Sequence, residues 1–417
     1  MSDEVKNESK SKKNKIYRNV GIVAGIIIII GCIALNIFTK NSLYNGKIAD
    51  NIFIQGVEVS HMTKTEAIEA VSKKYEPHNI HLDYKTNSYE IDYNDIDLSY
   101  NTKEIVQKAY NATRTGSYFN DITSYIKIKS SGKNYSIEVS YDEDKLDKSL
   151  DQIAQQINKK SKNATVSVEN GISYTKSKTG LQFETEDNKK LITEALKNKK
   201  YDNIDLKVTV TQPKISTEDV ASINTVLASF STSFNSALTS RSYNIGLAAQ
   251  RCNNVILLPG ETFSYNDHTG MRVLSNGFLN ASVILGGVYQ DAPGGGVCQT
   301  STTLFNAALL SGLEIDQVRN HSKTSHYVPR GRDAMVNDGG SDLKFTNNFD
   351  HPVYIQCYRS GSSVVAAVYG SSEDKVDVSI KVDNFTYNGL PGAKTYRTIT
   401  KNGKSKTSHI YTSVYQE

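Results

Sequence analysis

The longest apolar run of the chain lies near its N-terminus. Residues 20–38, VGIVAGIIIIIGCIALNIF, carry no charge and have about the length that a helix needs to cross a bilayer. Residues 1–19 are polar and rich in lysine, and cationic flanks stay on the cytoplasmic side. We therefore expect a cytoplasmic tail (1–19), a transmembrane anchor (20–38) and an exported body after Lys40. The alternative is a cleaved signal peptide, but its apolar region would be shorter, and ALNIFTK has no convincing cleavage site.

Residues 48–214 alternate between short strand patterns and amphipathic helix patterns. Thr63 and Glu66 have the spacing of a capping box, and HLDYKTNSYEIDY reads as a hairpin with Asn87 and Ser88 at its turn. Further on, EDKLDKSLDQIAQQINKK predicts a helix. The stretch has no cysteine and no cluster of carboxylates and histidines. We expect an α+β region of one or two small modules, with binding or spacing as its role.

The pattern changes twice more along the chain. Residues 215–240 are rich in Ser and Thr but keep apolar residues at helical spacing, which predicts a connecting helix. Glycines and turn residues become dense in residues 241–370, and alternation returns in 371–417, where Asn402 and Gly403 mark a hairpin. The predicted fold class is α+β, with one N-terminal transmembrane helix, a mixed α+β domain at 241–370 and a β-rich C-terminal segment.

The net charge and the number of cysteines limit the classes of function that fit this sequence. The net charge of +4 is spread along the 417 residues without a basic stripe, which argues against nucleic acid as a partner. Outside the membrane segment stand Cys252, Cys298 and Cys357, and this odd number leaves at least one thiol free. Cys252 reads as a core residue of a helix and Cys357 as an inward residue of a strand; whether the two pair is open.

Cys298 follows three glycines and precedes an apolar helix pattern, PGGGVCQTSTTLFNAALLSGL. At a helix start, unpaired N–H groups and the helix dipole stabilise a thiolate. Gly294, Gly295 and Gly296 let a substrate approach the backbone and leave N–H groups to stabilise an oxyanion. The pattern favours a nucleophile over the alternative, a buried structural cysteine.

A cysteine nucleophile needs a base, and the base needs an orienting group. His321 and His326 follow Cys298 at a distance that suits a helix and a returning strand; we take His321 as the base and His326 as the second candidate. Asp333 is the candidate that orients the imidazole. A metal site is the alternative use of one cysteine and two histidines, but the spacing is poor, so we expect no metal and no cofactor.

Several polar residues near the cysteine are candidates for substrate binding. Arginines can hold a carboxylate in a two-pronged contact, and four of them bracket the segment. The bracketing arginines are Arg241, Arg272, Arg330 and Arg332. The predicted substrate contacts are Arg241, Arg332, Gln299, Tyr327 and the three glycines.

The motifs LPGETFSYNDHTG, GGGVCQTSTTLFNAALLSGLEI, RNHS, YVPRGRDA and SDLKFTNN resemble the successive motifs of the VanW family over residues 241–370. AYNATRTG and SYDEDKLDKSLDQIAQQIN are similar to the peptidoglycan-binding domain that commonly precedes VanW domains in anchored Gram-positive proteins. Some clostridial members of this architecture are regarded as L,D-transpeptidases. On that likeness Cys298 is the nucleophile, and the family's histidine and aspartate fall on His321 and Asp333.

The resemblance implies a cell-wall enzyme on the outer face of the membrane. Its substrate would be the stem peptide of peptidoglycan, cross-linked through a cysteine thioester between two third-position residues. Two alternatives stay open: hydrolysis at the same site, as a carboxypeptidase or endopeptidase, and a peptidoglycan-binding protein without catalysis, linked to glycopeptide resistance.

Overall fold

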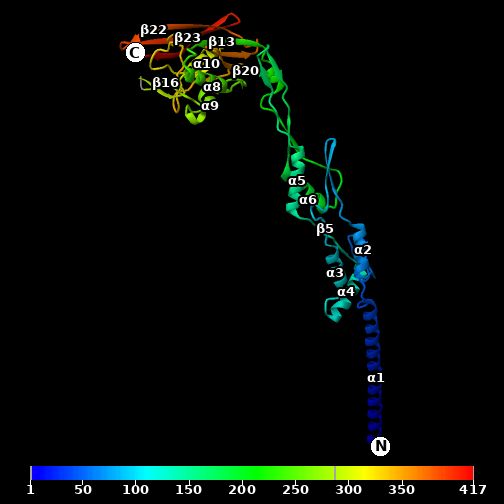
Figure 1. Cartoon of the computed structure of the whole chain (residues 1–417). Helices are drawn as coiled ribbons and strands as arrows, with labels where there is room; N and C mark the ends of the chain where they lie inside the picture. The colour runs from blue at the N-terminus through cyan, green and yellow to red at the C-terminus, as the bar shows by residue number, and fades with distance from the viewer. Residues whose placement is uncertain (1, 286–287, 417) are drawn as a thin grey trace. The chain divides into compact units, whose positions relative to one another are not determined.

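The computed structural model describes residues 2–285 and 288–416, and the chain folds into two compact units. Unit 1 comprises Met1–Lys159 and Leu181–Thr209, and unit 2 comprises Lys160–Gly180 and Val210–Glu417. Both units combine helices and strands (Figure 1). The fold is mixed α+β, as the sequence predicts.

Unit 1 contains two hydrophobic cores, and each defines a module. The first module (residues 43–75 and 101–137) buries Leu43, Ile54, Val71 and Val106. The second module (residues 80–100, 141–159 and 181–208) buries Leu82, Leu150, Phe183 and Ile192. The elements of unit 1 and its borders are α1 (Ser2–Ser42), β1 (Ile52–Ile54), β2 (Val57–Glu58), α2 (Lys64–Lys74), β3 (Ile80–Tyr84), β4 (Asn87–Ile91), β5 (Ser99–Tyr100), α3 (Thr102–Asn111), α4 (Tyr118–Ser131), β6 (Lys133–Tyr135), β7 (Val139–Ser140), α5 (Glu143–Ile157), β10 (Gly180–Phe183), α6 (Thr185–Lys197), β11 (Ile204–Asp205) and β12 (Val208–Thr211).

Two local predictions in unit 1 have different outcomes. The capping box is confirmed: Glu66 N–H donates to Thr63 Oγ1 at 3.3 Å, and Thr63 N–H donates to Glu66 Oε2 at 2.8 Å. The hairpin exists, but its turn is not at Asn87 and Ser88. Asn87 pairs with Tyr84, so the turn is Lys85–Thr86, with Lys85 at a φ of 56°.

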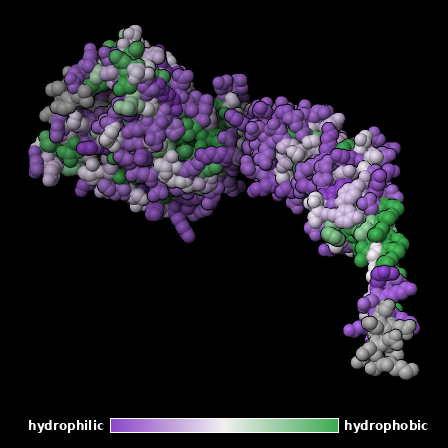
Figure 2. All heavy atoms as spheres, turned by 90° about the horizontal axis from the view of Figure 1, so that it is seen from below, coloured by the Kyte–Doolittle hydropathy of each residue, from purple (hydrophilic) through white to green (hydrophobic). Residues whose placement is uncertain are grey.

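Among the described residues, one helix is long and apolar enough to cross a membrane, at Lys12–Ser42 within α1. Its apolar window makes no contact that buries it inside the protein. In Figure 2 these turns form a green band between the polar N-terminal turns and the first module. Length and composition thus suit either an anchor or a signal sequence.

Unit 2 is built on a four-stranded antiparallel sheet in the order β13-β21-β20-β14. Helix α10 packs on β13 and β21, and α8 packs on β20. The elements of unit 2 are β8 (Thr165–Ser167), β9 (Ser173–Thr175), α7 (Thr217–Ala221), β13 (Thr225–Ser233), α8 (Thr239–Arg251), β14 (Val255–Leu257), β15 (Thr262–Ser264), α9 (Tyr265–Thr269), η1 (Leu274–Asn276), β16 (Asn280–Leu285), β17 (Val288–Pro293), α10 (Val297–Ser311), β18 (Glu314–Gln317), β19 (Lys344–Thr346), β20 (Val353–Ser360), β21 (Ser363–Gly370), β22 (Asp377–Tyr387), β23 (Leu390–Lys401) and β24 (Lys404–Val414).

The connecting helix predicted for residues 215–240 is wrong. Apart from the first two residues of α8, only Thr217–Ala221 is helical in this range, and Thr225–Ser233 forms β13, paired antiparallel with β21. Leu227 and Thr232 of this strand are buried. The many Ser and Thr residues suit a strand better than a helix, and pairing with β21 decides the outcome.

Candidate active site

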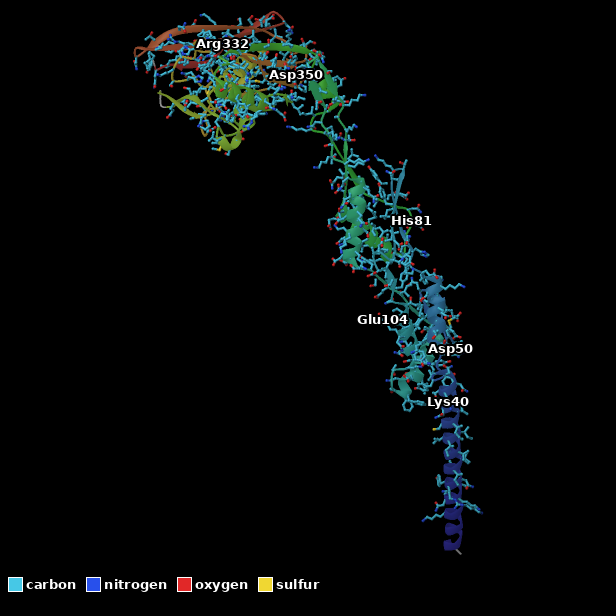
Figure 3. All side chains as sticks on the ribbon, in the orientation of Figure 1. Lys40, Asp50, His81, Glu104, Arg332 and Asp350 are labelled. Atoms are coloured by element: carbon cyan, nitrogen blue, oxygen red, sulfur yellow. The ribbon has the colours of Figure 1, made fainter. Side chains whose placement is uncertain are left out.

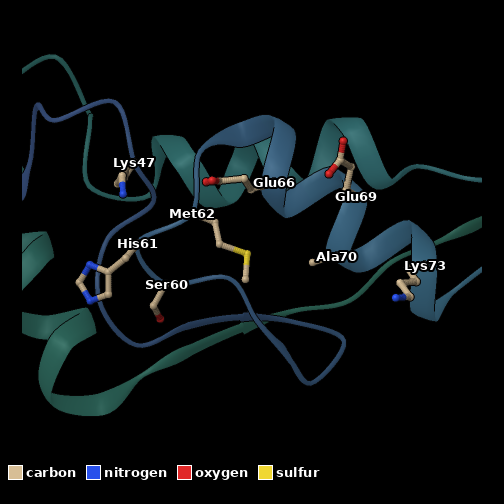
Figure 4. Close-up of a pocket in the computed structure, with 8 residues that line it drawn as sticks. All are labelled: Lys47, Ser60, His61, Met62, Glu66, Glu69, Ala70 and Lys73. Carbon is tan, nitrogen blue, oxygen red and sulfur yellow. The ribbon is translucent and has the colours of Figure 1, made fainter.

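A pocket of about 530 Å³ lies in the first module (Figure 4). Its lining residues are Lys47, Ser60, His61, Met62, Glu66, Glu69, Ala70 and Lys73. Ser60 Oγ accepts a hydrogen bond from Ile52 N–H at 3.2 Å, and His61 is paired with Asp50 at 2.6 Å. The hydroxyl and the imidazole thus have separate partners, and the pocket contains no nucleophile coupled to a base.

The nucleophile-and-base arrangement is found in unit 2, at the start of α10. Cys298 is the second residue of this helix, and Gly296 occupies the N-cap position with a φ of 110°. No side chain caps the helix, and the cysteine lies at the positive end of the helix dipole. This is the position that the glycine run predicts.

The glycines are required by close packing as well as by backbone angles. A Cβ on Gly295 would lie 2.7 Å from the main-chain carbonyl of Ala281 and the carbonyl oxygen of Ser282. Gly294 and Gly296 have positive φ values of 87° and 110°. The turn into α10 can therefore form only with residues that lack a side chain.

His321 and Asp333 lie next to Cys298. His321 Nδ1 and the His321 main-chain N–H both contact Asp333 Oδ2 at 2.7 Å. The carboxylate is fully buried, and the His321 side chain is 12 % exposed. Because Asp333 holds Nδ1, the other ring nitrogen of His321 is left for its hydrogen bond with the Cys298 thiol.

The electrostatics of this group favour a thiolate and an imidazolium. Burial opposes the thiolate of Cys298, but the hydrogen bond with His321, the charge of that ring and a hydrogen bond with the Val336 main chain outweigh it, so the pKa lies below its usual value. Burial also opposes the imidazolium, but its hydrogen bonds to Asp333 and Cys298 raise the pKa of His321 to about 10. By contrast, burial raises the pKa of both Cys252 and Cys357, which are buried free thiols.

We expect iodoacetamide to alkylate Cys298 at pH values well below those at which a free thiol reacts, because its pKa is lowered. A free thiol has a pKa of about 8.5. Intact-mass time courses over a pH series, with peptide mapping, measure the rate for each cysteine. Cys252 and Cys357 serve as internal controls and should stay unlabelled in the folded protein. A rate for Cys298 that climbs steadily through pH 8 and 9 would contradict the ion pair.

Of the residues predicted to bind substrate, some lie close to Cys298 in the structure and others do not. Tyr327 lies beside the site: its ring meets His321 edge-on, with 6.5 Å between centroids. Arg241 contacts the glycine turn, where its carbonyl lies 3.0 Å from a Cβ placed on Gly296. Its guanidinium donates to Gln299 Oε1 at 2.9 Å. Tyr327, Arg241 and the three glycines are thus close to Cys298.

Gln299 and Arg332 are not where direct substrate contact would need them. Gln299 is 1 % exposed, and its amide nitrogen donates to Thr232 and Ser233 of β13. It holds Arg241 in place, so the prediction of a substrate contact needs correction. Arg332 (labelled in Figure 3) donates to Asn306 Oδ1 at 2.6 Å, and Asn306 is more than two turns along α10 from Cys298.

His326 and Arg272, the other candidates near the cysteine in sequence, differ in how close they lie to Cys298. His326 is exposed, whereas the hydrogen-bond partners of the Cys298 thiol are His321 and Val336. Arg272 is 8 % exposed, pairs with Asp338 at 2.7 Å and is close enough to lower the pKa of Cys298. Sequence analysis grouped Arg272 with the other arginines as a possible carboxylate contact; its burial and its pairing with Asp338 are seen only in the structure.

The main-chain N–H of Cys298, at the helix start, is available to a ligand. Val297 N–H donates to the Gly294 carbonyl at 3.1 Å, and Gln299 N–H donates to the Gly296 carbonyl at 3.0 Å. Cys298 N–H, between them, has no acceptor among residues 2–285 and 288–416. It is therefore placed to stabilise an oxyanion beside Sγ.

Two tyrosines from the end of the chain complete the site, and sequence analysis missed both. The Tyr415 hydroxyl donates to Asp333 Oδ1 at 2.6 Å and accepts from Gly331 N–H at 2.8 Å. The Tyr411 hydroxyl donates to the main-chain carbonyl of Asp333 at 2.8 Å. Both carboxylate oxygens of Asp333 thus have donors. No sequence motif indicates this, because the tyrosines lie about eighty residues beyond the aspartate.

In the part of the chain that the structure describes, no group of three or more His, Cys, Asp or Glu side chains has an arrangement that could hold a metal ion. The site geometry described above uses only side chains and main-chain groups of unit 2.

Comparisons with known proteins identify two domains in the chain. Residues 240–369 match the family described as VanW like protein, and residues 89–205 match the family described as "Putative peptidoglycan binding domain". Both predicted resemblances are confirmed, and Cys298, His321 and Asp333 lie inside the first match. A VanW-like domain after a peptidoglycan-binding domain supports a cell-wall protein.

Two curated relatives are similar to parts of the chain. The protein named Uncharacterized protein YoaR, of Bacillus subtilis (strain 168), is 42% identical over 160 residues, which are 38% of this chain and 53% of the relative. Vancomycin B-type resistance protein VanW, of Enterococcus faecalis (strain ATCC 700802 / V583), is 26% identical over 150 residues, 35% of this chain and 54% of the relative. The chain spans about half the length of these curated relatives. No solved structure matches it.

Proposed function

We propose that the protein is a membrane-anchored L,D-transpeptidase of peptidoglycan, with Cys298 as its nucleophile. The observation that carries the proposal is the hydrogen-bonded series Cys298–His321–Asp333 at an uncapped helix start, with a thiol pKa below the usual value. The VanW-like and peptidoglycan-binding matches supply the substrate class. The α1 helix would hold the chain in the membrane, with both units facing the wall.

The first half of the reaction would acylate the enzyme. The Cys298 thiolate attacks the carbonyl carbon between the third residue of a stem peptide and its terminal D-alanine. Cys298 N–H is placed to stabilise the resulting oxyanion. The His321 imidazolium then gives its proton to the departing amine, D-alanine leaves, and a thioester remains on Sγ.

The second half would transfer the acyl group. The side-chain amine of a neighbouring stem attacks the thioester, and the now neutral His321 takes the proton of this amine. The thiolate of Cys298 leaves, and the imidazolium is restored, so the ion pair is ready for a new cycle. Asp333 keeps Nδ1 protonated throughout and fixes the ring. The product is a 3-3 cross-link between two stems.

The test is to incubate the full chain in detergent with purified disaccharide-tetrapeptides and to weigh the products. The expected product is a dimer that has lost one D-alanine. Tripeptide and free D-alanine without a dimer would identify a hydrolase that uses the same site. Substrate that is bound but never consumed would identify a binding protein and would overturn catalysis.

The C-terminal tyrosines provide a matched pair of variants. Tyr415→Phe removes a donor to the Asp333 carboxylate, whereas Tyr411→Phe removes a donor to the Asp333 main chain. We expect both to be destabilised, since each loses a buried hydrogen bond. Only Tyr415→Phe should also lose activity, by roughly tenfold, because a loss of about 1.4 kcal/mol in orientation corresponds to that factor.

Thermal unfolding and the rate of dimer formation, measured on both variants, check this expectation. Equal losses of activity in the two variants would show that the tyrosines act through stability alone.

A further inference from the structure

We propose that the first turn of α4 is a second membrane contact, with Phe119 and Tyr118 in the interface of the leaflet from which α1 emerges. This inference rests on the proposed anchoring by α1. It concerns a surface that the transpeptidase chemistry does not use. It also lies outside the VanW-like match at residues 240–369.

Helix α1 enters the first module without a break. The helix continues to Ser42, four residues beyond the apolar run that ends at Phe38. Leu43 is fully buried in the core of this module, and Thr39 is 3 % exposed. Phe38 meets Tyr125 of α4 edge-on, with 5.4 Å between ring centroids. The module is therefore packed directly on the end of the candidate membrane helix.

The start of α4 lies at the level where the apolar run of α1 ends. Thr39 Oγ1 and the Tyr118 hydroxyl lie 3.4 Å apart. Thr39 follows Phe38 by one residue, which is about 1.5 Å along a helix axis. If the apolar run fills the hydrocarbon layer, Tyr118 is at the boundary between hydrocarbon and headgroups. Figure 3 shows Lys40 at this end of the module, with Asp50 just beyond it.

Aromatic side chains are exposed to solvent at this level. Phe119 is 75 % exposed, Tyr44 is 47 % exposed and Tyr118 is 37 % exposed. Single exposed apolar residues are common, but here three aromatic rings gather beside a helix that leaves a membrane. Tyrosine, with its apolar ring and polar hydroxyl, is enriched at this boundary. Insertion would remove the ring of Phe119 from water, which is favourable.

The charged groups at this end of the module also suit a membrane surface. Lys40 and Lys47 are exposed near the same end, whereas the carboxylate of Asp121, in the first turn of α4, is buried. Asp121 accepts hydrogen bonds from the Tyr44 hydroxyl at 2.7 Å and from Thr115 Oγ1 at 2.8 Å. The surface therefore shows ammonium groups and aromatic rings, while its acidic group is covered. This combination suits phosphate headgroups over an apolar layer.

The chain has no tryptophan, so a single substitution reports on this surface without interference. Phe119→Trp is the probe, because a side chain that is 75 % exposed can change without loss of core packing. His81→Trp is the matched control in the same unit; His81 is about half exposed and lies toward the opposite end of unit 1 from Lys40 (Figure 3). The full chain is reconstituted into vesicles of phosphatidylglycerol and phosphatidylcholine, with and without brominated acyl chains.

We expect the Phe119→Trp indole to shift its emission to shorter wavelength on reconstitution and to be quenched by brominated lipid. The His81→Trp indole should keep its aqueous emission and stay accessible to acrylamide. Vesicles that float with the protein while the Phe119→Trp indole stays aqueous would overturn the second contact and leave the anchor intact.

Two other outcomes are also decisive. An indole at position 119 that is shielded from acrylamide but not quenched by brominated lipid would show that a second copy of the chain covers this surface, against the proposal. Protein that does not float with the vesicles would overturn the anchor and the second contact together.

Discussion

Cys298→Ser protein folds normally but makes no 3-3 cross-linked dimers; this is the largest loss that we expect from a single substitution. Serine has nearly the size of cysteine, so the turn into α10 and its packing on β13 are kept. The hydroxyl stays protonated at neutral pH, whereas the Cys298 thiol has a lowered pKa beside His321. The rate should fall roughly a thousandfold or more.

Product masses after incubation with tetrapeptide substrate measure this loss, and circular dichroism checks the fold. Cys357→Ser is the control, because Cys357 is also a free thiol of unit 2 but is fully buried in the sheet. It should cost stability and keep turnover in the molecules that remain folded. A folded Cys298→Ser protein that still forms dimers would refute the nucleophile.

His321→Ala protein loses turnover by about 10²–10⁴-fold, the usual contribution of a general acid and base, while His326→Ala keeps most of it. The structure separates the two rings: His321 contacts both Cys298 and Asp333, and His326 is exposed. His321→Ala should also move the alkylation of Cys298 to higher pH, since the thiolate loses its largest stabilising partner.

The pH dependence of turnover follows from the same ion pair. Acylation needs a thiolate and an imidazolium, and the pKa of His321 is raised to about 10. Turnover should therefore fall as the pH rises through about 10, while the alkylation of Cys298, which needs no proton donor, should not fall. Asp333→Asn should reduce turnover less than His321→Ala, because it disturbs orientation and tautomer only. Loss of activity in His326→Ala but not in His321→Ala would reverse the assignment.

Local sequence patterns were sufficient where the structure depends on near neighbours. The capping box of α2 and the start of α10 after three glycines follow from spacing within a few residues. The apolar run at residues 20–38 likewise identifies a helix of membrane-spanning length. In each case the determining interactions join residues close in sequence, so the pattern alone carries them.

The composition of the site was predictable only in part. Cys298 could be chosen from its helix start, while His321 and His326 remained alternatives on residue spacing, and resemblance to the VanW motifs favoured His321. The structure adds that His321 bonds to both Cys298 and Asp333. Arg332 was chosen by charge and proximity in sequence, but it lies beside Asn306, because residues 332–336 run along α10 from Asn306 back to Cys298.

By itself, the sequence determined the α+β class, the apolar N-terminal helix and the position of Cys298 at a helix start. Only the tertiary structure decided that residues 225–233 form a strand, since that depends on pairing with β21 more than a hundred residues later. It also decided that Tyr415, from the end of the chain, donates to Asp333. Such contacts join segments far apart in sequence, and the arrival of a distant hydroxyl at a buried carboxylate has no local pattern from which it could be predicted.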